Sequence, residues 1–311
     1  MQSQDKIVQS VPVVVGIDAG GTKTRAFAVS QAGEIVGRGA GGGGNLLSSP
    51  DPRGSIAAAL QEALAGRSPD AVVLSCSGGE RDADRAKGRA ILSGLVGPAV
   101  AVEVTHDALA ALYAGNPLGC GVVLIAGTGS IAYGRNDQGA EARCGGWGYL
   151  VGDEGSAFWL GAEGLRAASY DHDGRGSPTR ITRHLFADLA VTDFNGVLPQ
   201  LYGRPHPPTA IQAATRAVAR AYADGDAIAV NIVQRGARHL AEMAATVART
   251  LLLEGGPVYL AGGAFENVRP LEAGLRLELL GSLPRAAVEP VGAEPAMGAA
   301  RLAARLAWGA P

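Results

Sequence analysis

The sequence predicts an α/β protein built from two similar halves. The first observation is an arrangement that occurs twice, at residues 11–38 and again from residue 122: a β-branched strand, a tight turn with glycine and threonine, a second strand, another turn and a third strand. The second observation is that strands alternate with helix-like segments between the two copies, which is typical of a mainly parallel sheet. We therefore expect a duplicated α/β domain whose two lobes face each other across a central cleft.

The elements of the first half follow in order. We expect strands at residues 11–17, 24–29 and 34–38, a helix at 54–65, a strand at 71–75, a helix at 81–95, a strand at 99–104 and a short helical run at 108–113. The β-branched residues of the first strand indicate that it is buried.

The second half becomes mostly helical after its own strands. We expect strands at residues 122–126 and 131–135, a helix at 156–169, glycine- and proline-rich connections at 171–179 and 202–209, a long helix at 226–253, a strand at 258–260 and an alanine-rich helix at 294–308. The long helix is amphipathic, because its apolar residues recur at helical spacing.

Composition and charge narrow the functional classes. The chain has 311 residues, 47% of them apolar, and a net charge of −2, which gives no electrostatic argument for binding nucleic acid or an anionic membrane surface. The first ten residues do not resemble a secretory signal, and no apolar run approaches the roughly 20 residues that span a bilayer. The cysteines Cys76, Cys120 and Cys144 include no Cys-x-x-Cys pair, which argues against a disulfide framework or a zinc site and favours a cytoplasmic location.

Two glycine-rich turns that follow buried strands are candidates for phosphate binding, because their backbone N–H groups can cradle phosphate oxygens. Residues 16–21 nearly match the Walker A pattern, but Thr22 stands where lysine is required and a strand follows instead of a helix. Residues 127–132 match a dinucleotide-binding pattern, yet a strand follows there too. A β-hairpin phosphate loop, used in a pair, fits both turns.

A family resemblance appears in these two turns and in six further stretches. Asp18-x-Gly20-Gly21-Thr22-x-Thr24 resembles the first phosphate loop of the actin-like ATPase and hexokinase superfamily, Gly127-Thr128-Gly129-Ser130 its second, and Ala261-Gly262-Gly263 its adenosine motif. Within that superfamily the chain is similar to the N-acetylglucosamine kinases of the BadF/BadG/BcrA/BcrD-type ATPase grouping. The stretches that carry this similarity are Asn45 after its glycine run, Ser77-Gly78-Gly79, Thr105-His106-Asp107-Ala108, Cys144-Gly145-Gly146-Trp147-Gly148 and Gly152-Asp153-Glu154-Gly155-Ser156.

The resemblance implies a fold and a domain organisation. Each lobe would have the ribonuclease H-like fold of the actin-like ATPases. The last helix would return to the first lobe, which gives a first lobe of residues 1–117 plus 294–311 and a second lobe of residues 118–293. A homodimer formed through the larger helical lobe is also implied.

The resemblance further implies ATP and Mg²⁺ as ligands. The expected nucleotide- and phosphate-binding residues are Gly20, Gly21, Thr22, Gly127, Thr128, Gly129, Gly262 and Gly263. Asp18 ends a buried strand beside the first loop, where a hard carboxylate suits Mg²⁺ that keeps several of its waters. The alternative for Asp18 is an aspartate that only forms the turn.

Asp107 is the candidate general base, since phosphoryl transfer to an alcohol needs a group that accepts the hydroxyl proton. It follows a predicted strand and starts a helical run, so a helix-capping aspartate is the alternative from position alone. The resemblance favours the catalytic role. The neighbouring His106 is a second candidate base.

The expected sugar-binding residues are Asn45, Ser77, Gly78, Asp107, Gly146, Trp147, Gly148 and Asp153. Asn45 follows four glycines that on composition alone could be a flexible linker. Trp147 could stack on a sugar or brace its own loop. The carboxylate of Asp153 could accept hydrogen bonds from sugar hydroxyls, or Asp153 and Ser156 could cap the next helix.

The expected activity is ATP-dependent phosphorylation of an amino sugar, N-acetylglucosamine first, to its 6-phosphate. Glucosamine and N-acetylmuramic acid are alternative substrates. A partner-driving ATPase, like the activators of 2-hydroxyacyl-CoA dehydratases, is a different class that dispersed cysteines do not favour. A sugar-sensing regulator is disfavoured because about a dozen residues precede the first loop, too few for a DNA-binding helix pair.

Overall fold

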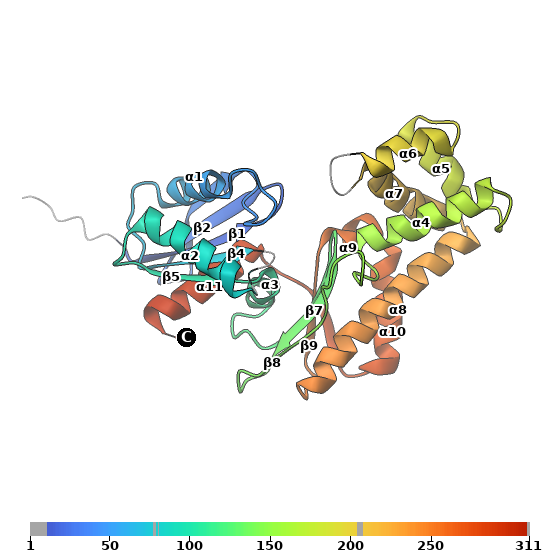
Figure 1. Cartoon of the computed structure of the whole chain (residues 1–311). Helices are drawn as coiled ribbons and strands as arrows, with labels where there is room; N and C mark the ends of the chain where they lie inside the picture. Colours follow the sequence, from blue (N-terminus) through green and yellow to red (C-terminus); the bar gives the residue numbers. More distant parts are fainter. Residues whose placement is uncertain (1–10, 77–78, 80, 204–207, 310–311) are drawn as a thin grey trace, which may run out of the picture. The chain divides into compact units, whose positions relative to one another are not determined.

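The computed structural model describes residues 11–76, 79, 81–203 and 208–309. The chain divides into two compact units, one comprising Met1–Gly119 with Val291–Pro311 and the other Cys120–Pro290 (Figure 1). Among the described residues no helix is long and apolar enough to cross a membrane.

The first unit is a five-stranded sheet with helices on both faces. Its strands are β1 (Val13–Ala19), β2 (Thr24–Ser30), β3 (Ile35–Gly41), β4 (Ala71–Cys76) and β5 (Ala101–Thr105), in the order β3-β2-β1-β4-β5. Its helices are α1 (Pro52–Leu64), α2 (Asp82–Val96), α3 (Asp107–Gly115) and α11 (Pro295–Trp308). The hairpins β1–β2 and β2–β3 are antiparallel, whereas β4 and β5 add in parallel.

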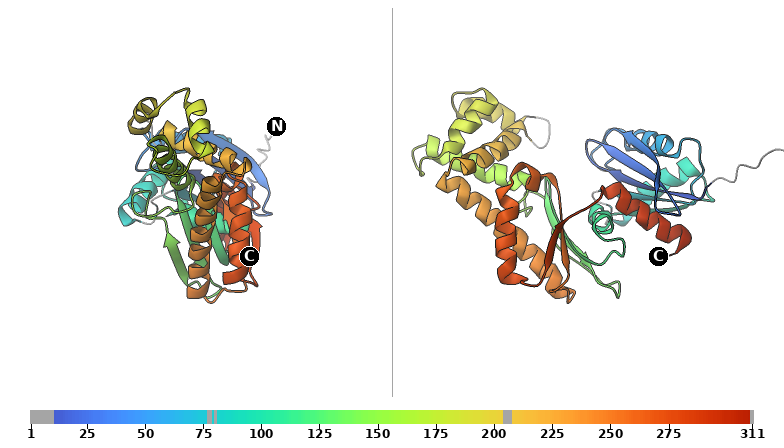
Figure 2. Two further views of the ribbon diagram at one scale, coloured as in Figure 1. Left: turned by 90° about the vertical axis from the view of Figure 1, so that its right-hand side faces the viewer. Right: turned by 180° about the vertical axis from the view of Figure 1, so that it is seen from behind.

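The second unit repeats this sheet and adds more helices. Its strands are β6 (Gly121–Ala126), β7 (Ser130–Arg135), β8 (Glu141–Gly145), β9 (Pro257–Ala261) and β10 (Ala287–Pro290), in the order β10-β9-β6-β7-β8. Its helices are α4 (Ala157–His172), α5 (Arg180–Leu189), α6 (Phe194–Tyr202), α7 (Thr209–Ala223), α8 (Ala227–Thr250), α9 (Gly263–Asn267) and α10 (Pro270–Ser282). Figure 2 shows the helices α4 to α7 gathered beyond one end of this sheet.

The two sheets have the same topology. Strands β6, β7, β8, β9 and β10 take the places of β1, β2, β3, β4 and β5, with the same antiparallel and parallel pairings. The two predicted phosphate loops therefore occupy equivalent hairpins, β1–β2 and β6–β7. The predicted duplication of an α/β domain is confirmed.

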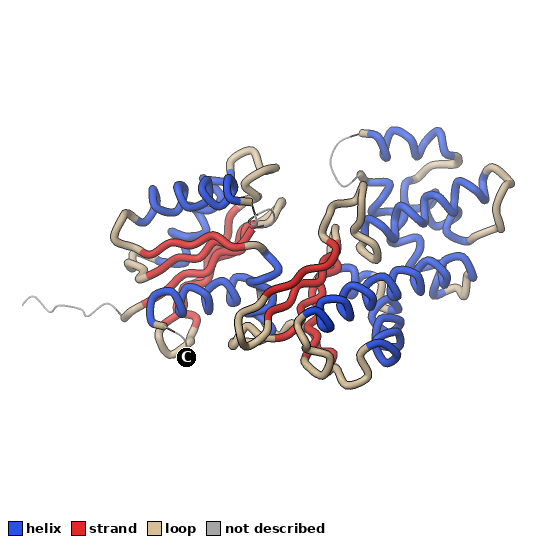
Figure 3. The backbone as a smooth tube through the Cα atoms, turned by 60° about the horizontal axis from the view of Figure 1, so that its bottom comes forward, coloured by secondary structure: helices blue, strands red, loops and turns tan. Residues whose placement is uncertain are grey.

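Side chains that alternate along β1 divide the core of the first unit into two layers, one on each face of the sheet. Figure 3 shows helices on both sides of this sheet. Val13, Val15 and Ile17 pack with apolar residues of α1 and α2 on one face, while Val14 packs with α3 and α11 on the other. This is the two-faced burial that a β-branched run in a central strand predicts. In the second unit one large cluster joins α4, α7, α8 and α10 to β6 and β9.

Helix α11 reaches the first sheet through small residues. A Cβ added to Gly298 would lie 1.8 Å from the carbonyl oxygen of Ala110 in α3, and one added to Gly16 would lie 2.0 Å from the backbone nitrogen of Ala300. Such a close approach of two backbones tolerates no side chain at these positions.

We expect Gly298→Ala to lower the free energy of unfolding by about 3 kcal/mol or more, because the methyl group collides with backbone that cannot move aside. The matched control is Gly94→Ala in α2, where an added Cβ meets only the far end of an arginine at 4.0 Å. That change should stabilise the protein by roughly 1 kcal/mol, the helix propensity gained over glycine. Urea denaturation of both variants measures the difference, and equal stabilities would contradict this packing.

Candidate active site

The carboxyl ends of three parallel strands bring polar residues to one edge of the first sheet. In the strand register Asp18 of β1 lies opposite Ser75 of β4, and Ser75 lies opposite Thr105 of β5. Asp107 begins α3 two residues after β5 ends. Ligands of open α/β sheets bind beyond such carboxyl ends, so this edge is a candidate site.

The surroundings of Asp18 disfavour the ionised form of its carboxyl group. Burial and, next, the negative charge of Asp107 raise the pKa of Asp18 from 3.8 to about 6; this value includes a lowering effect of Lys23 and a smaller raising effect of Glu294. The hydroxyl of Ser75, fully buried, has no hydrogen-bond partner among the described residues. A hydrated divalent cation would relieve the repulsion and supply polar partners, so these oxygen donors fit Mg²⁺. Among the described residues no group of three or more His, Cys, Asp or Glu side chains could hold a metal ion.

At the start of α3, the helix is capped by His106 and not by Asp107. His106 is the N-cap residue, and its Nδ1 accepts a hydrogen bond from the backbone N–H of Leu109 at 3.2 Å. The carboxylate of Asp107 accepts the N–H of Ala108 through Oδ1 at 2.9 Å. The cap that position alone could assign to Asp107 is therefore supplied by His106, and this contact occupies the ring nitrogen that would make His106 a base.

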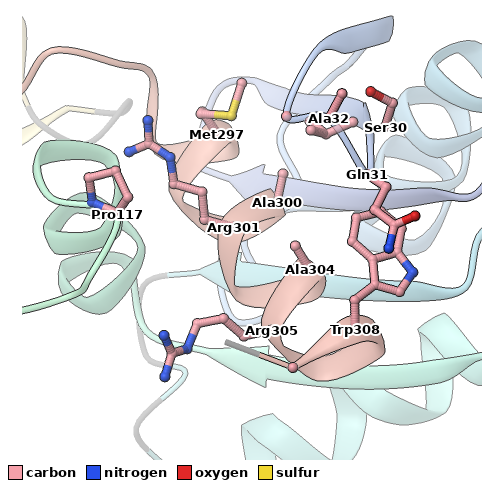
Figure 4. A pocket seen from close by; sticks show the side chains of 13 residues that line it. Ser30, Gln31, Ala32, Pro117, Met297, Ala300, Arg301, Ala304, Arg305 and Trp308 are labelled. Atoms are coloured by element: carbon pink, nitrogen blue, oxygen red, sulfur yellow. The ribbon is translucent and has the colours of Figure 1, made fainter. Parts of the chain in front are cut away.

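The far end of α3 is fixed by α11. The guanidinium of Arg301 donates hydrogen bonds to the carbonyl oxygens of Tyr113 and Ala114, at the last turn of α3. Arg301 lines a cavity of about 530 Å³ between α11 and the β2–β3 turn, and Figure 4 shows Met297, Ala300, Ala304 and Trp308 along its helical side. None of the predicted site residues lines this cavity. Its arginine holds the helix that begins with Asp107.

The first phosphate loop is held by the glycine run that precedes Asn45. The carbonyl oxygen of Gly20 accepts the N–H groups of Gly44 and Asn45, at 3.0 and 3.1 Å. A Cβ on Gly43 would lie 2.3 Å from the carbonyl oxygen of Gly21, so the run packs closely against the loop. Gly21 and Thr22 themselves are exposed. The structure thus brings Asn45 together with Gly20 and Gly21, and the run is packed rather than a free linker.

The side chain of Asn45 shapes its own loop. Its Oδ1 accepts the backbone N–H groups of Leu47 and Ser48, at 2.9 and 3.1 Å. Ser77 and Gly78, which were also predicted to bind the sugar, lie outside the described residues. Gly79 lies beside the end of β5, because an added Cβ would meet the carbonyl oxygen of Thr105 at 2.4 Å.

The second phosphate loop is wrapped by the stretch from Gly146 to Ala157. Four hydrogen bonds join them: Gly146 N–H to Ser130 O at 2.9 Å, Ser130 N–H to Asp153 Oδ1 at 3.3 Å, the Ser130 hydroxyl to Glu154 O at 2.8 Å, and Ala157 N–H to Gly127 O at 2.9 Å. The predicted sugar-binding stretch and the predicted phosphate loop therefore form one hydrogen-bonded structure within the second unit. The helix that follows, α4, is capped by Ser156, whose hydroxyl accepts the Trp159 N–H.

Trp147 projects from this stretch with 68% of its surface exposed. The guanidinium of Arg143 lies 4.3 Å from the centroid of its rings and donates to the carbonyl oxygens of Gly145 and Gly146. A cation–π contact of this kind holds the indole in place. Arg143, which the sequence analysis did not single out, thus braces the tryptophan while leaving much of its surface open.

A cavity of about 370 Å³ in the second unit lies where two of the predicted nucleotide-binding motifs meet. Thr128 of the second phosphate loop lines it, and so does Asn267, which ends α9 after the Gly262–Gly263 motif. Gly262 adopts a φ of 102°, and an added Cβ would meet the carbonyl oxygen of Ala126 at 2.3 Å, so only glycine fits there. The other lining residues are Ala157, Phe158, Ile211, Gln212, Thr215 and Arg216. The size suits part of a nucleotide.

This wall of the cavity was not predicted from the sequence, because four of its residues lie on α7. Ile211, Gln212, Thr215 and Arg216 lie at the i, i+1, i+4 and i+5 spacing that puts residues on adjoining faces of a helix. No local motif marks them, and the signal lies in the long-range contact between the Thr215 hydroxyl and the carbonyl oxygen of Ala157, 2.7 Å apart.

We expect Gln212→Trp to raise the KM for ATP about tenfold or more. Gln212 lines the cavity, and the larger indole would fill part of the space proposed for the nucleotide. Gln212 is exposed on α7, so the fold should tolerate the change. The KM for the second substrate should stay within about twofold. Gln138→Trp, on an exposed turn of the same unit, is the matched control. Steady-state kinetics with ATP varied decides, and an unchanged KM would remove this cavity from the nucleotide site.

Comparison with known proteins identifies the family. The profile of the BadF/BadG/BcrA/BcrD ATPase family matches residues 15–303. The chain belongs to this family. The predicted resemblance is thereby confirmed, and the protein is an enzyme of an ATP-using family.

Curated relatives extend over nearly the whole BadF/BadG/BcrA/BcrD-family chain. It is 30% identical over 301 residues to an N-acetylmuramic acid/N-acetylglucosamine kinase of Clostridium acetobutylicum, covering 93% of this chain and 97% of the relative. It is 28% identical over 313 residues to an N-acetyl-D-glucosamine kinase of Dictyostelium discoideum, covering 94% and 98%.

Solved structures share the fold of this family member. A Chromobacterium violaceum protein assigned as an N-acetylglucosamine kinase has a TM-score of 0.72 and 25% identity, with 94% of this chain and 99% of that chain covered. A glucokinase of the ROK family from Streptomyces griseus, solved with glucose and AMPPNP, has a TM-score of 0.59 and 19% identity, covering 94% and 99%. The predicted fold class, two lobes of the actin-like kind, is confirmed.

Proposed function

We propose that this protein is an ATP-dependent amino sugar kinase that converts N-acetylglucosamine to its 6-phosphate. The observation that carries the proposal is the packing of a predicted sugar-binding segment on each phosphate loop. In the first unit the segment ending at Asn45 is bonded to Gly20, and in the second the stretch from Gly146 to Ala157 is bonded to residues 127–130. Sugar and phosphate groups would thus be held by the same pieces of backbone. The curated relatives, which are kinases of N-acetylated amino sugars, support the same substrate class.

Asp107 is the proposed general base. Its carboxylate accepts the proton of the sugar 6-hydroxyl as that oxygen attacks the γ-phosphorus of ATP and the bond to the bridging oxygen of ADP breaks. Its place at the start of α3, anchored at the other end by Arg301, fixes the carboxylate on a rigid element. Precise placement of such a group contributes much of the rate enhancement in phosphoryl transfer.

The two phosphate loops would bind the transferred phosphoryl group through backbone N–H groups and the hydroxyls of Thr22 and Thr128. The cavity beside Thr128 and Asn267 would hold the adenosine. Asp18 would hold Mg²⁺, which when bound neutralises the charge of the phosphates. Asn45, Trp147 and Asp153 would contact the sugar. Homodimer formation and a cytoplasmic location stay predictions.

The test is ADP release with Mg·ATP against a panel of N-acetylglucosamine, glucosamine, N-acetylmuramic acid, N-acetylmannosamine, glucose and no sugar. We expect strong turnover with an N-acetylated amino sugar and little turnover without sugar. Preference for glucosamine or N-acetylmuramic acid would still identify an amino sugar kinase, but with that sugar as its substrate in place of N-acetylglucosamine. Steady hydrolysis that no sugar changes would overturn the proposal and favour a partner-driving ATPase.

A further inference from the structure

Asp153 has a backbone conformation and an environment that a surface loop does not require. Its φ is 61°, in the left-handed region, and only 8% of its surface is exposed. Ala65 and Ala190, which share this conformation, are helix C-caps, whereas Asp153 precedes the N-cap of α4. Aspartate tolerates this region better than most residues, but a buried carboxylate still requires hydrogen bonds. The carboxylate is therefore held in place by a backbone conformation that is unfavourable for most residues.

The carboxylate lies between two segments that are distant in sequence. Its Oδ1 accepts the backbone N–H of Ser130, which ends the second phosphate loop, at 3.3 Å. Burial raises the pKa of Asp153, while the backbone N–H groups of Ser130 and of Gly148, in the stretch that carries Trp147, lower it. A Cβ on Gly129 would lie only 2.7 Å from Oδ2, so the loop packs directly on the carboxylate. A side chain of the sugar-binding stretch thus binds and packs against the backbone of the second phosphate loop.

We infer that Asp153 is a positioning residue that couples the sugar-binding stretch to the second phosphate loop. This inference rests on the proposed function, which assigns those two segments. The carboxylate fixes the direction of the Ser130 N–H and the path of the loop through Gly129. A sugar bound at Gly148 and Trp147 would change the position of the same carboxylate or hold it in place. Sugar binding would therefore alter the position of the backbone N–H groups in the second phosphate loop that bind the phosphate. Asp153 consequently acts on nucleotide binding even when no sugar is present.

The first test is Asp153→Asn, because asparagine keeps the size and tolerates the same φ. It removes the negative charge that strengthens the hydrogen bond from the Ser130 N–H, and it replaces one carboxylate oxygen by an amide NH₂ that cannot accept a backbone N–H. We expect the Kd for Mg·ATP, measured by calorimetry without sugar, to rise about tenfold or more. Asp137→Asn, the same chemical change on an exposed turn of this unit, should leave it unchanged. A residue that only contacts sugar would raise the KM for sugar and leave this Kd within about twofold, which would overturn the inference.

The second test needs no variant and decides the matter should Asp153→Asn not fold. Amide hydrogen exchange of the wild-type protein is measured over residues 127–133 with and without N-acetylglucosamine and with no nucleotide. Coupling predicts that the sugar alone slows exchange at Ser130. Unchanged exchange at a saturating sugar concentration overturns the inference while leaving the kinase proposal standing. A wild-type protein that binds neither Mg·ATP nor any amino sugar overturns the proposed function and the inference with it.

Discussion

Asp107→Asn should reduce the kcat of sugar-dependent ADP release by about a thousandfold, because asparagine cannot accept the hydroxyl proton during transfer. The substitution preserves size, and its fold should be unaffected because His106 supplies the N-cap of α3. The KM values for sugar and ATP should change by less than about tenfold, as expected for an interaction made in the transition state. Initial rates with N-acetylglucosamine and ATP at saturation measure this.

The control for Asp107→Asn is Asp82→Asn. Asp82 is the first residue of α2 in the same unit, as Asp107 is of α3, and its side chain is fully exposed beside Arg85. Both substitutions remove a first-turn carboxylate from a helix, so both lose the same small dipole interaction. Only Asp107→Asn should lose activity. A variant at position 107 that keeps wild-type turnover would contradict the assignment of the base.

Asp18→Asn should stabilise the ligand-free protein while abolishing its activity. The folded-state pKa of Asp18 is about 6, against an ordinary value of 3.8. A difference of about two units corresponds to about 3 kcal/mol by which the ionised carboxylate destabilises the fold at neutral pH. Asparagine removes that charge, and with it the ligand proposed for Mg²⁺.

The stabilisation has a defined pH dependence. Because the folded pKa is raised, the folded protein binds a proton that the unfolded chain has released between pH 3.8 and about 6. Wild-type stability therefore falls through this window as pH rises, and the penalty is constant above it. We expect Asp18→Asn to be more stable by about 3 kcal/mol near pH 8 and by only about 1 kcal/mol near pH 4.5.

Urea denaturation of the ligand-free proteins at both pH values measures this gain, with Asp82→Asn as the control for removing an exposed carboxylate. Equal stabilities of wild type and Asp18→Asn at high pH would contradict the prediction that the ionised Asp18 carboxylate destabilises the fold. The same titration predicts that the affinity of the ligand-free protein for Mg²⁺ falls as pH drops through about 6, because protons then compete with the cation for Asp18.

Local pattern was sufficient to predict the elements that carry the phosphate loops. The β-branched run of β1 and the tight turns after β1 and β6 depend on neighbours in sequence, and the structure has strands and hairpins at those positions. The predicted helix at residues 54–65 begins at Pro52 because Asp51 caps it. Strand β10 was not predicted, since it has only four residues, which are mostly exposed, end in proline and show no alternation.

The contacts around the site could not be predicted in the same way. The glycine-rich stretch around Trp147 was predicted to bind a sugar. The structure shows that it first encloses the second phosphate loop, through bonds such as that between Asp153 and Ser130, 23 residues apart. Such pairings arise from chain topology, which no local motif encodes. Contact of this stretch with sugar stays a prediction.

The most direct test of the account is the chemical identity of the product. The protein is incubated with Mg·ATP and N-acetylglucosamine, and the products are analysed by phosphorus NMR and mass spectrometry. We expect one phosphate ester at the 6-position of the sugar, formed in equal amount to ADP, and its rate of formation should be about a thousandfold lower with Asp107→Asn. ADP accompanied only by inorganic phosphate, with the sugar unmodified, would contradict it.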